Sequence, residues 1–151
     1  MAVYFVDVFK YNMVQAYFGE FETQYLHLLT SANGAYPVSY AFDYASYTAS
    51  ESAFKGYTMQ VLTGLTFTND TTNHQTIISF PTATFSYNSA ESGNASETVD
   101  GFCITNGTGG ATIAVGSISP GKVISTDGDE IIITFSSNVF EDVAGTIDPV
   151  S

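Results

Sequence analysis

The sequence predicts a mostly β fold, an antiparallel β-sandwich or jelly roll of about seven strands preceded by one N-terminal helix. From Tyr57 onward, apolar and polar residues alternate with a period of two, which is typical of strands with one buried face. Turn-forming residues separate these strands at intervals of about 8–12 residues. No helical pattern lies between the strands, which argues against parallel βαβ units. We expect residues 1–151 to form a single domain.

The first predicted element is a helix over residues 3–18. Val6, Phe9, Met13 and Ala16 recur at a spacing of three to four residues, which places them on one apolar face, and Gly19 marks the end of the helix. A short strand is then predicted over Gln24–Leu29, at the start of a sandwich that spans residues 24–136.

A long loop is predicted over residues 31–55, because this stretch lacks periodicity and is rich in Ser and Ala. It carries alternating aromatic residues, which suit a protein interface because they bury a large area at little cost in entropy. The alternative is that these rings fold down onto one end of the core. As contact residues we predict Tyr36, Tyr40, Phe42, Tyr44 and Tyr47, together with Phe140 in an extended tail over residues 137–151.

The remaining strands follow from the alternation and the turn residues. Gly64 marks a bulge or bend within a strand over residues 57–67, and Pro81 marks an edge position or a break, since proline cannot donate to a ladder. The predicted order is a loop at 68–74, strands at 76–80 and 83–87, a loop at 88–97, a strand at 99–105, a turn at 106–110, a strand at 111–118, a turn at 120–121, a short strand at 123–124, a turn at 127–128 and a strand at 130–135.

The charge balance restricts the classes of partner. The chain has 15 acidic residues, three lysines and no arginine, for a formal net charge of −12. Such a surface repels nucleic acids and anionic membranes, so we expect neither as a partner. The acidity either selects neutral, basic or apolar partners or serves only to keep the protein in solution. The N-terminus lacks the pattern of a signal peptide, and we expect synthesis in a cytoplasm.

Residues able to support catalysis or metal binding are few. The two histidines, His27 in a strand and His74 in a loop, are expected to be structural or surface residues, and Cys103 is expected to be a buried apolar residue. Asp127 and Asp129 offer oxygen ligands for calcium, but the interpretation that we favour is a charged hairpin turn before a very apolar strand. We therefore predict no catalytic, cofactor-binding or metal-binding residues and no enzyme activity.

Short motifs in a fixed order resemble those of a family of small virion structural proteins of tailed bacteriophages. Residues 26–31 resemble its Leu-x-Leu-Tyr-Thr-Ser strand and residues 54–57 its Phe-x-Gly-Tyr step. Residues 99–106 resemble its Tyr-Gly-Tyr-Phe-Val-Thr-Asp strand and residues 127–133 its Asn-Gly-Asp-x-Ile-x-Val strand. The chain departs from the family at Leu65 and at Ile113-Ala114-Val115, where the family often has Trp and Leu-Leu-Trp-Ala-Glu.

This resemblance implies a non-enzymatic capsid decoration (cement) protein on the outer surface of the phage head, assembled in the host cytoplasm. It would act as a homotrimer that clamps the major capsid protein or other virion proteins and so stabilises the shell. The alternative is a tail, baseplate or fibre-associated protein that takes part in host recognition. A virion-associated hydrolase is a third reading.

Overall fold

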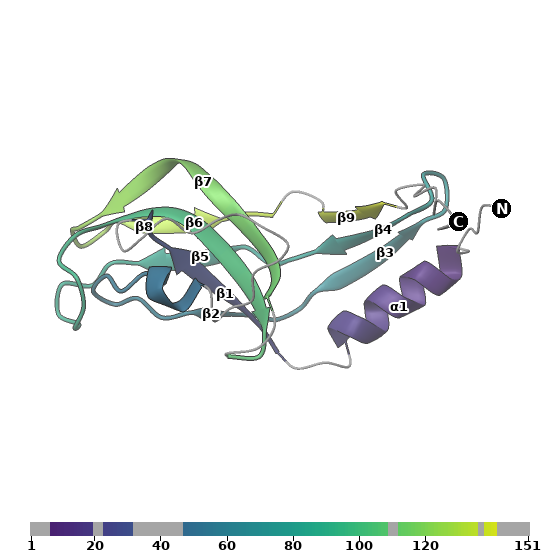
Figure 1. Cartoon of the computed structure of the whole chain (residues 1–151), viewed down its shortest axis with the longest axis horizontal. Coiled ribbons are helices and arrows are strands. Elements are labelled where there is room, and N and C mark those ends of the chain that lie inside the picture. Colours follow the sequence, from purple (N-terminus) through teal and green to yellow (C-terminus); the bar gives the residue numbers. More distant parts are fainter. Residues whose placement is uncertain (1–6, 20–22, 32–46, 109–111, 136–137, 142–151) are drawn as a thin grey trace, which may run out of the picture. The chain divides into compact units, whose positions relative to one another are not determined.

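The computed structural model describes residues 7–19, 23–31, 47–108, 112–135 and 138–141. Within these residues it is mostly β, with antiparallel sheets and one N-terminal α-helix, which confirms the predicted fold class (Figure 1). The chain divides into two compact units, each assembled from separate stretches of sequence. Unit 1 contains residues 1–21, 64–81 and 135–151, and unit 2 contains residues 22–63 and 82–134.

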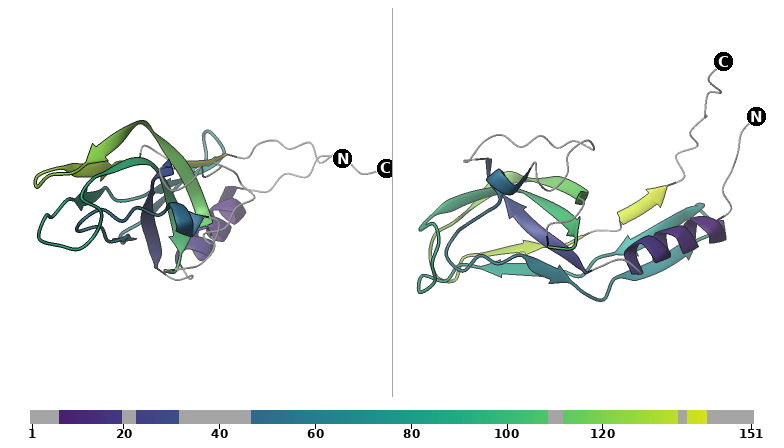
Figure 2. Two further views of the ribbon diagram at one scale, coloured as in Figure 1. Left: turned by 60° about the vertical axis from the view of Figure 1, so that its left-hand side comes forward. Right: turned by 60° about the horizontal axis from the view of Figure 1, so that its bottom comes forward.

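Unit 2 is a small sandwich built from two antiparallel sheets. The larger sheet has the order β2-β1-β6-β7, formed by Gln60–Leu62, Gln24–Leu29, Glu97–Asn106 and Thr112–Ile124. The smaller sheet pairs β5 (Ala83–Ser86) with β8 (Glu130–Ile133) (Figure 2). Long-range pairing of β1 with β6 brings residues about eighty positions apart into register, from Gln24 opposite Asn106 to Leu29 opposite Gly101.

The core of unit 2 follows the predicted alternation. Ala83, Phe85 and Tyr87 are buried, whereas Thr84 and Ser86 between them are exposed. Burial of alternate side chains is what a strand with one solvated face requires. A 3-10 turn, η2 (Thr48–Ser50), lies between β1 and β2 along the chain.

Unit 1 consists of α1 (Asp7–Gly19) packed on the hairpin of β3 (Thr66–Asp70) and β4 (Gln75–Ser79), with β9 (Asn138–Glu141) paired to β4. Aromatic rings join the helix to the hairpin: Phe18 lies 6.4 Å from Phe67 and 6.3 Å from Phe80, between ring centroids. Phe80 also lies 5.2 Å from Phe135. Within the predicted extended tail, residues 138–141 form the strand β9.

The predicted face of the helix is wrong at Met13, whereas Ala16, predicted on the same face, is half-buried. Met13 is 56% exposed, while Phe18 is only 6% exposed and Tyr11 and Val14 are half-buried on the same side. These three residues are spaced i, i+3 and i+7, which defines the packed face. The helix is apolar on more than one side, so the sequence pattern alone did not identify the side that meets β3 and β4. Val6 and the side chain of Phe9 lie outside the described part of the chain.

Two predicted strand boundaries are also wrong. The single strand over residues 57–67 is two strands, β2 and β3, which belong to different units and are separated by Gly64 with a φ of +80°. The turn predicted at Pro120-Gly121 is not present, because β7 continues through both residues to Ile124. The two residues lie where the pairing of β7 with β6 shifts register, between Val99 and Gly101. The break predicted at Pro81 is confirmed, since the chain passes there from unit 1 to unit 2.

Among the described residues, no helix has the length and apolar character needed to cross a membrane.

Candidate functional site

The predicted contact residues divide into those that the structure describes and those that it does not. Tyr36, Tyr40, Phe42 and Tyr44 lie outside the described residues, as does the side chain of Phe140. Tyr47 is fully buried against Leu29 and Cys103. Tyr47 therefore takes the second of the two roles considered for these rings and belongs to the core of unit 2.

The two ends of the long loop meet at one point of the sheet, here called the loop base and formed by Thr30, Ser31, Ser50 and Glu51. The Thr30 amide donates to the Ser50 carbonyl at 2.7 Å, and Leu29 pairs with Glu51 in an isolated antiparallel bridge. Just beyond, the Ser52 amide donates to the Leu28 carbonyl at 2.9 Å. The described ends of the predicted loop are therefore held together beside β1.

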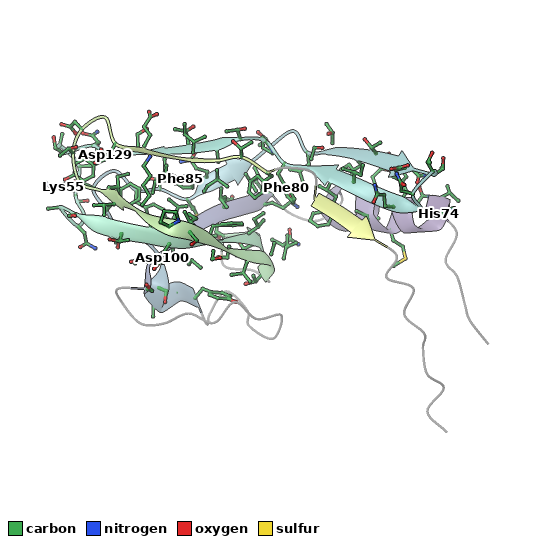
Figure 3. All side chains as sticks on the ribbon, turned by 90° about the horizontal axis from the view of Figure 1, so that it is seen from above. Lys55, His74, Phe80, Phe85, Asp100 and Asp129 are labelled. Carbon is green, nitrogen blue, oxygen red and sulfur yellow. The ribbon has the colours of Figure 1, made fainter. Side chains whose placement is uncertain are left out.

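Two carboxylates fix the loop base. Asp100 on β6 accepts hydrogen bonds from the Ser31 amide, at 3.0 Å, and from the Ser31 hydroxyl (Figure 3). On the other side, Glu51 Oε1 accepts a hydrogen bond from the Tyr57 hydroxyl at 2.9 Å and lies 2.8 Å from His27 Nδ1. Charge-assisted hydrogen bonds of this kind are stronger than neutral ones, so both ends of the loop are firmly held.

His27 joins Glu51 to the interior of the sheet. Its ring is fully buried, and Nε2 lies 3.0 Å from Thr105 Oγ1, which in turn donates to the Gly107 carbonyl at 2.8 Å. A hydroxyl, an imidazole and a carboxylate in series resemble the order of a catalytic triad. However, Thr105 is also fully buried and its proton is directed at Gly107, so its oxygen has no path to a substrate in this arrangement.

A third carboxylate, Glu97, fastens the chain that follows the loop. Glu97 is 7% exposed, and its Oε2 accepts the amides of Ala53 at 2.9 Å and Phe54 at 3.1 Å. Next to these hydrogen bonds, Phe54 and Asn94 form an isolated parallel β-bridge. Beside this chain lies an open hollow of about 550 Å³, lined by Thr48, Glu51, Ser52, Ala53, Phe54, Tyr57, Thr58, Met59, Ser92 and Gly93.

The carboxylates of the acidic turn after β7 accept hydrogen bonds from neighbouring loop residues. Asp127 accepts hydrogen bonds from the Ser89 amide at 2.6 Å and hydroxyl at 2.5 Å. Asp129 Oδ2 accepts the amides of Ser125 and Thr126 at 2.8 and 2.9 Å. These hydrogen bonds, first those from Ser89 and from Ser125, lower the pKa of both carboxyl groups. The carboxylates thus hold two loops in shape, and no described cluster of three or more His, Cys, Asp or Glu residues could hold a metal ion.

Cys103 is buried in the same sheet, directly opposite His27. Burial, with a smaller contribution from the negative charge of Glu51, raises the pKa of its thiol to about 12. A thiol with this pKa stays protonated and unreactive at neutral pH. The prediction of a buried apolar role for Cys103 is confirmed.

The residues that organise the site, Glu51, Glu97 and Asp100, were not identified from the sequence. Each acts on a partner far away along the chain, so no local spacing reveals it. Comparisons of this chain with protein-family models, with curated proteins and with solved structures gave no match.

Proposed function

We propose that the chain is a non-enzymatic structural protein of a bacteriophage virion, and specifically a decoration protein that binds and stabilises the assembled head. The observation that carries this proposal is the location of the four motifs that resemble the virion protein family. All four, residues 26–31, 54–57, 99–106 and 127–133, fall within unit 2, although other parts of the chain between them belong to unit 1. This common location supports the proposal, because the four stretches form parts of one folded unit.

Within unit 2 the first motif contacts the second and the third. Residues 26–29 pair with residues 101–104 along β1 and β6. The Tyr57 hydroxyl from the second motif accepts a hydrogen bond from the Leu28 amide at 3.2 Å. The fourth motif supplies Ile131, 3% exposed, to the core of the same unit. These contacts support a shared fold, because each motif contributes to the packing of unit 2.

The distribution of chemical groups in unit 2 also favours a binding function. The groups capable of nucleophilic or acid–base chemistry at the sheet centre, His27, Thr105 and Cys103, are fully buried and hydrogen-bonded or protonated. The outer faces instead carry apolar side chains, with Val123 55% and Ile132 58% exposed. Exposed apolar side chains on a chain with a net charge of −12 suit a neutral or basic protein surface such as a capsid shell.

The test uses phage heads emptied of DNA and stripped of this chain. Purified protein is added back, and both the number of bound copies per head and the rupture temperature of the head are measured. A protein that binds only the assembled shell must stabilise it, by about 2.7 kcal/mol at a free concentration of 100 Kd. We expect saturable binding and a higher rupture temperature. Binding to host cells and not to heads would overturn the decoration proposal in favour of the tail or fibre alternative, and binding to neither would overturn both.

A further inference from the structure

The turn after β6 begins with Asn106-Gly107, in which the side-chain carboxamide of Asn106 is followed by a backbone nitrogen that no side chain shields. Gly107 has a φ of +76°, in the left-handed region that favours glycine, so the turn itself calls for this residue. We propose that Asn106 is a deamidation site that the pairing of β1 with β6 keeps unreactive, so that it is modified only after this end of the sheet has opened. The proposal is independent of the proposed virion function.

Deamidation at this pair needs no reagent other than water. The Gly107 nitrogen attacks Asn106 Cγ, a new N–Cγ bond replaces the Cγ–Nδ2 bond, and ammonia leaves with the former amide proton. Water then opens the cyclic imide to aspartate or isoaspartate, which adds one negative charge. Gly107 lines an open hollow of about 320 Å³ together with Thr23, Tyr25 and Thr108, so water has access to the imide once it has formed.

The attacking nitrogen is restrained by hydrogen bonds and by strand pairing. The Gly107 amide donates to the Thr23 carbonyl at 3.0 Å, and the Gly107 carbonyl accepts the Thr105 hydroxyl at 2.8 Å. Asn106 lies in β6 opposite Gln24, which keeps its backbone extended. Ring closure requires the Asn106 backbone to rotate out of this conformation, so the Gly107–Thr23 hydrogen bond must break before the nitrogen reaches Cγ.

The carboxamide under attack lies in an equally unfavourable environment. Asn106 Oδ1 is buried and has no hydrogen-bond partner among the described residues. Attack on Cγ places negative charge on this oxygen, and a buried oxyanion without a donor is strongly disfavoured. Local opening of the sheet end removes these restraints together, so the rate of modification follows the population of the open state.

The first test needs no substitution. The protein is incubated at pH 8 both folded and unfolded in concentrated urea, and peptide mapping by mass spectrometry measures aspartate and isoaspartate at position 106 over time. We expect modification in both samples, with a rate at least about tenfold lower in the folded protein. Equal rates would show that the fold gives no protection, and an unmodified Asn106 in urea would show that the pair is not a deamidation site. Either result would overturn the proposal.

The second test loosens the restraint on Gly107. Thr105→Val removes the hydroxyl that holds the Gly107 carbonyl, while Thr126→Val removes a comparable hydroxyl bonded to Asp129 at a remote turn. In the folded state we expect Thr105→Val to raise both the deamidation rate at Asn106 and the hydrogen-exchange rate of the Gly107 amide, by the same factor of about ten. Thr126→Val should keep the parent rates, and all three proteins should react alike in urea.

The paired readouts separate local opening from a general loss of stability. If Thr126→Val accelerates deamidation as much as Thr105→Val does, the pairing of β1 with β6 is not the specific restraint. If deamidation and exchange of the Gly107 amide change by different factors, the reaction does not pass through this opening. Should Thr105→Val fail to fold, the same comparison of the two rates is made in the parent protein at urea concentrations below its unfolding transition, where unequal increases would likewise refute the proposal.

Discussion

At the scale of single residues, the buried carboxylate of Glu97 anchors the chain that follows the long loop. It accepts two consecutive backbone amides, from Ala53 and Phe54, in a position that is 7% exposed. Both amides donate to the same oxygen, Oε2, so in Glu97→Gln the remaining side-chain oxygen keeps both partners but loses the negative charge that strengthens these hydrogen bonds. We expect a loss of about 1–3 kcal/mol in the free energy of unfolding by urea.

The matched control is Glu130→Gln, the same substitution at an exposed position on β8. It should change the free energy of unfolding by no more than about 0.5 kcal/mol. If the two variants unfold at the same urea concentration, the Glu97 carboxylate is not the anchor that its hydrogen bonds indicate.

Asp127 gives a prediction about pH. Its pKa is lowered from the usual 3.8, first by the side-chain hydrogen bond of Ser89, so the folded state favours the charged form more than the unfolded chain does. The resulting stabilisation is fully present above pH 3.8 and is lost as the pH falls through the lower folded-state pKa. In urea unfolding between pH 5 and pH 2, the parent should lose more stability than Asp127→Asn, in which that titration is absent. Parallel pH curves would count against the Asp127–Ser89 contact.

At the scale of elements, the loop between β5 and β6 packs against the chain after η2 through a glycine. Gly93 has a φ of +132°, and a Cβ there would lie 2.6 Å from the Ala53 carbonyl oxygen. Gly128 has a φ of +97° but open space around it, so Gly128→Ala isolates the backbone strain from the clash. We expect Gly128→Ala to cost about 1 kcal/mol and Gly93→Ala clearly more, about 2–4 kcal/mol. Thermal unfolding of both variants would check the order, and equal melting temperatures would contradict the close packing at Gly93.

The helix of unit 1 provides a test of which face is packed. Phe18→Ala removes a ring that contacts Phe67 and Phe80 and should cost about 3–5 kcal/mol. Met13→Ala, at a position that is 56% exposed, should cost less than about 0.5 kcal/mol. Chemical unfolding followed by circular dichroism distinguishes the two. A larger effect at Met13 than at Phe18 would restore the face that the sequence pattern favoured.

What could be predicted from sequence depends on the range of the interactions involved. The alternation in β5 and β8 was predicted because one buried face imposes a period of two on neighbouring residues. The packed face of the helix was not predicted, because Phe18 packs against Phe67, which lies almost fifty residues later in the chain. The carboxylate anchors were missed for the same reason, since Glu97 and Glu51 act on residues 44 and 24 positions away. Gly64 was read as a bend in one strand because local sequence does not reveal that a chain is changing units.

At the scale of the whole molecule, charge and exposed apolar area together define what the chain can bind. A net charge of −12 with no arginine makes close approach to acidic surfaces costly. Contact must then come from apolar side chains that are already exposed. In unit 2 these include Val123 on β7 and Ile132 on β8, whose cross-strand neighbours Thr98 and Thr84 are exposed as well.

The proposed decoration function therefore predicts that Val123→Asp combined with Ile132→Asp abolishes head binding without unfolding the protein. Burying one such side chain contributes about 1.5–3 kcal/mol, so losing both and adding two charges should weaken binding by at least about a hundredfold. The matched control, Thr72→Asp with Ser117→Asp, adds the same charge at two exposed polar positions. Affinity for emptied heads would be measured by sedimentation, with urea unfolding as the check on folding. If the control weakens binding as much as the test variant, charge and not apolar contact governs docking; if neither does, the docking face lies elsewhere on the chain.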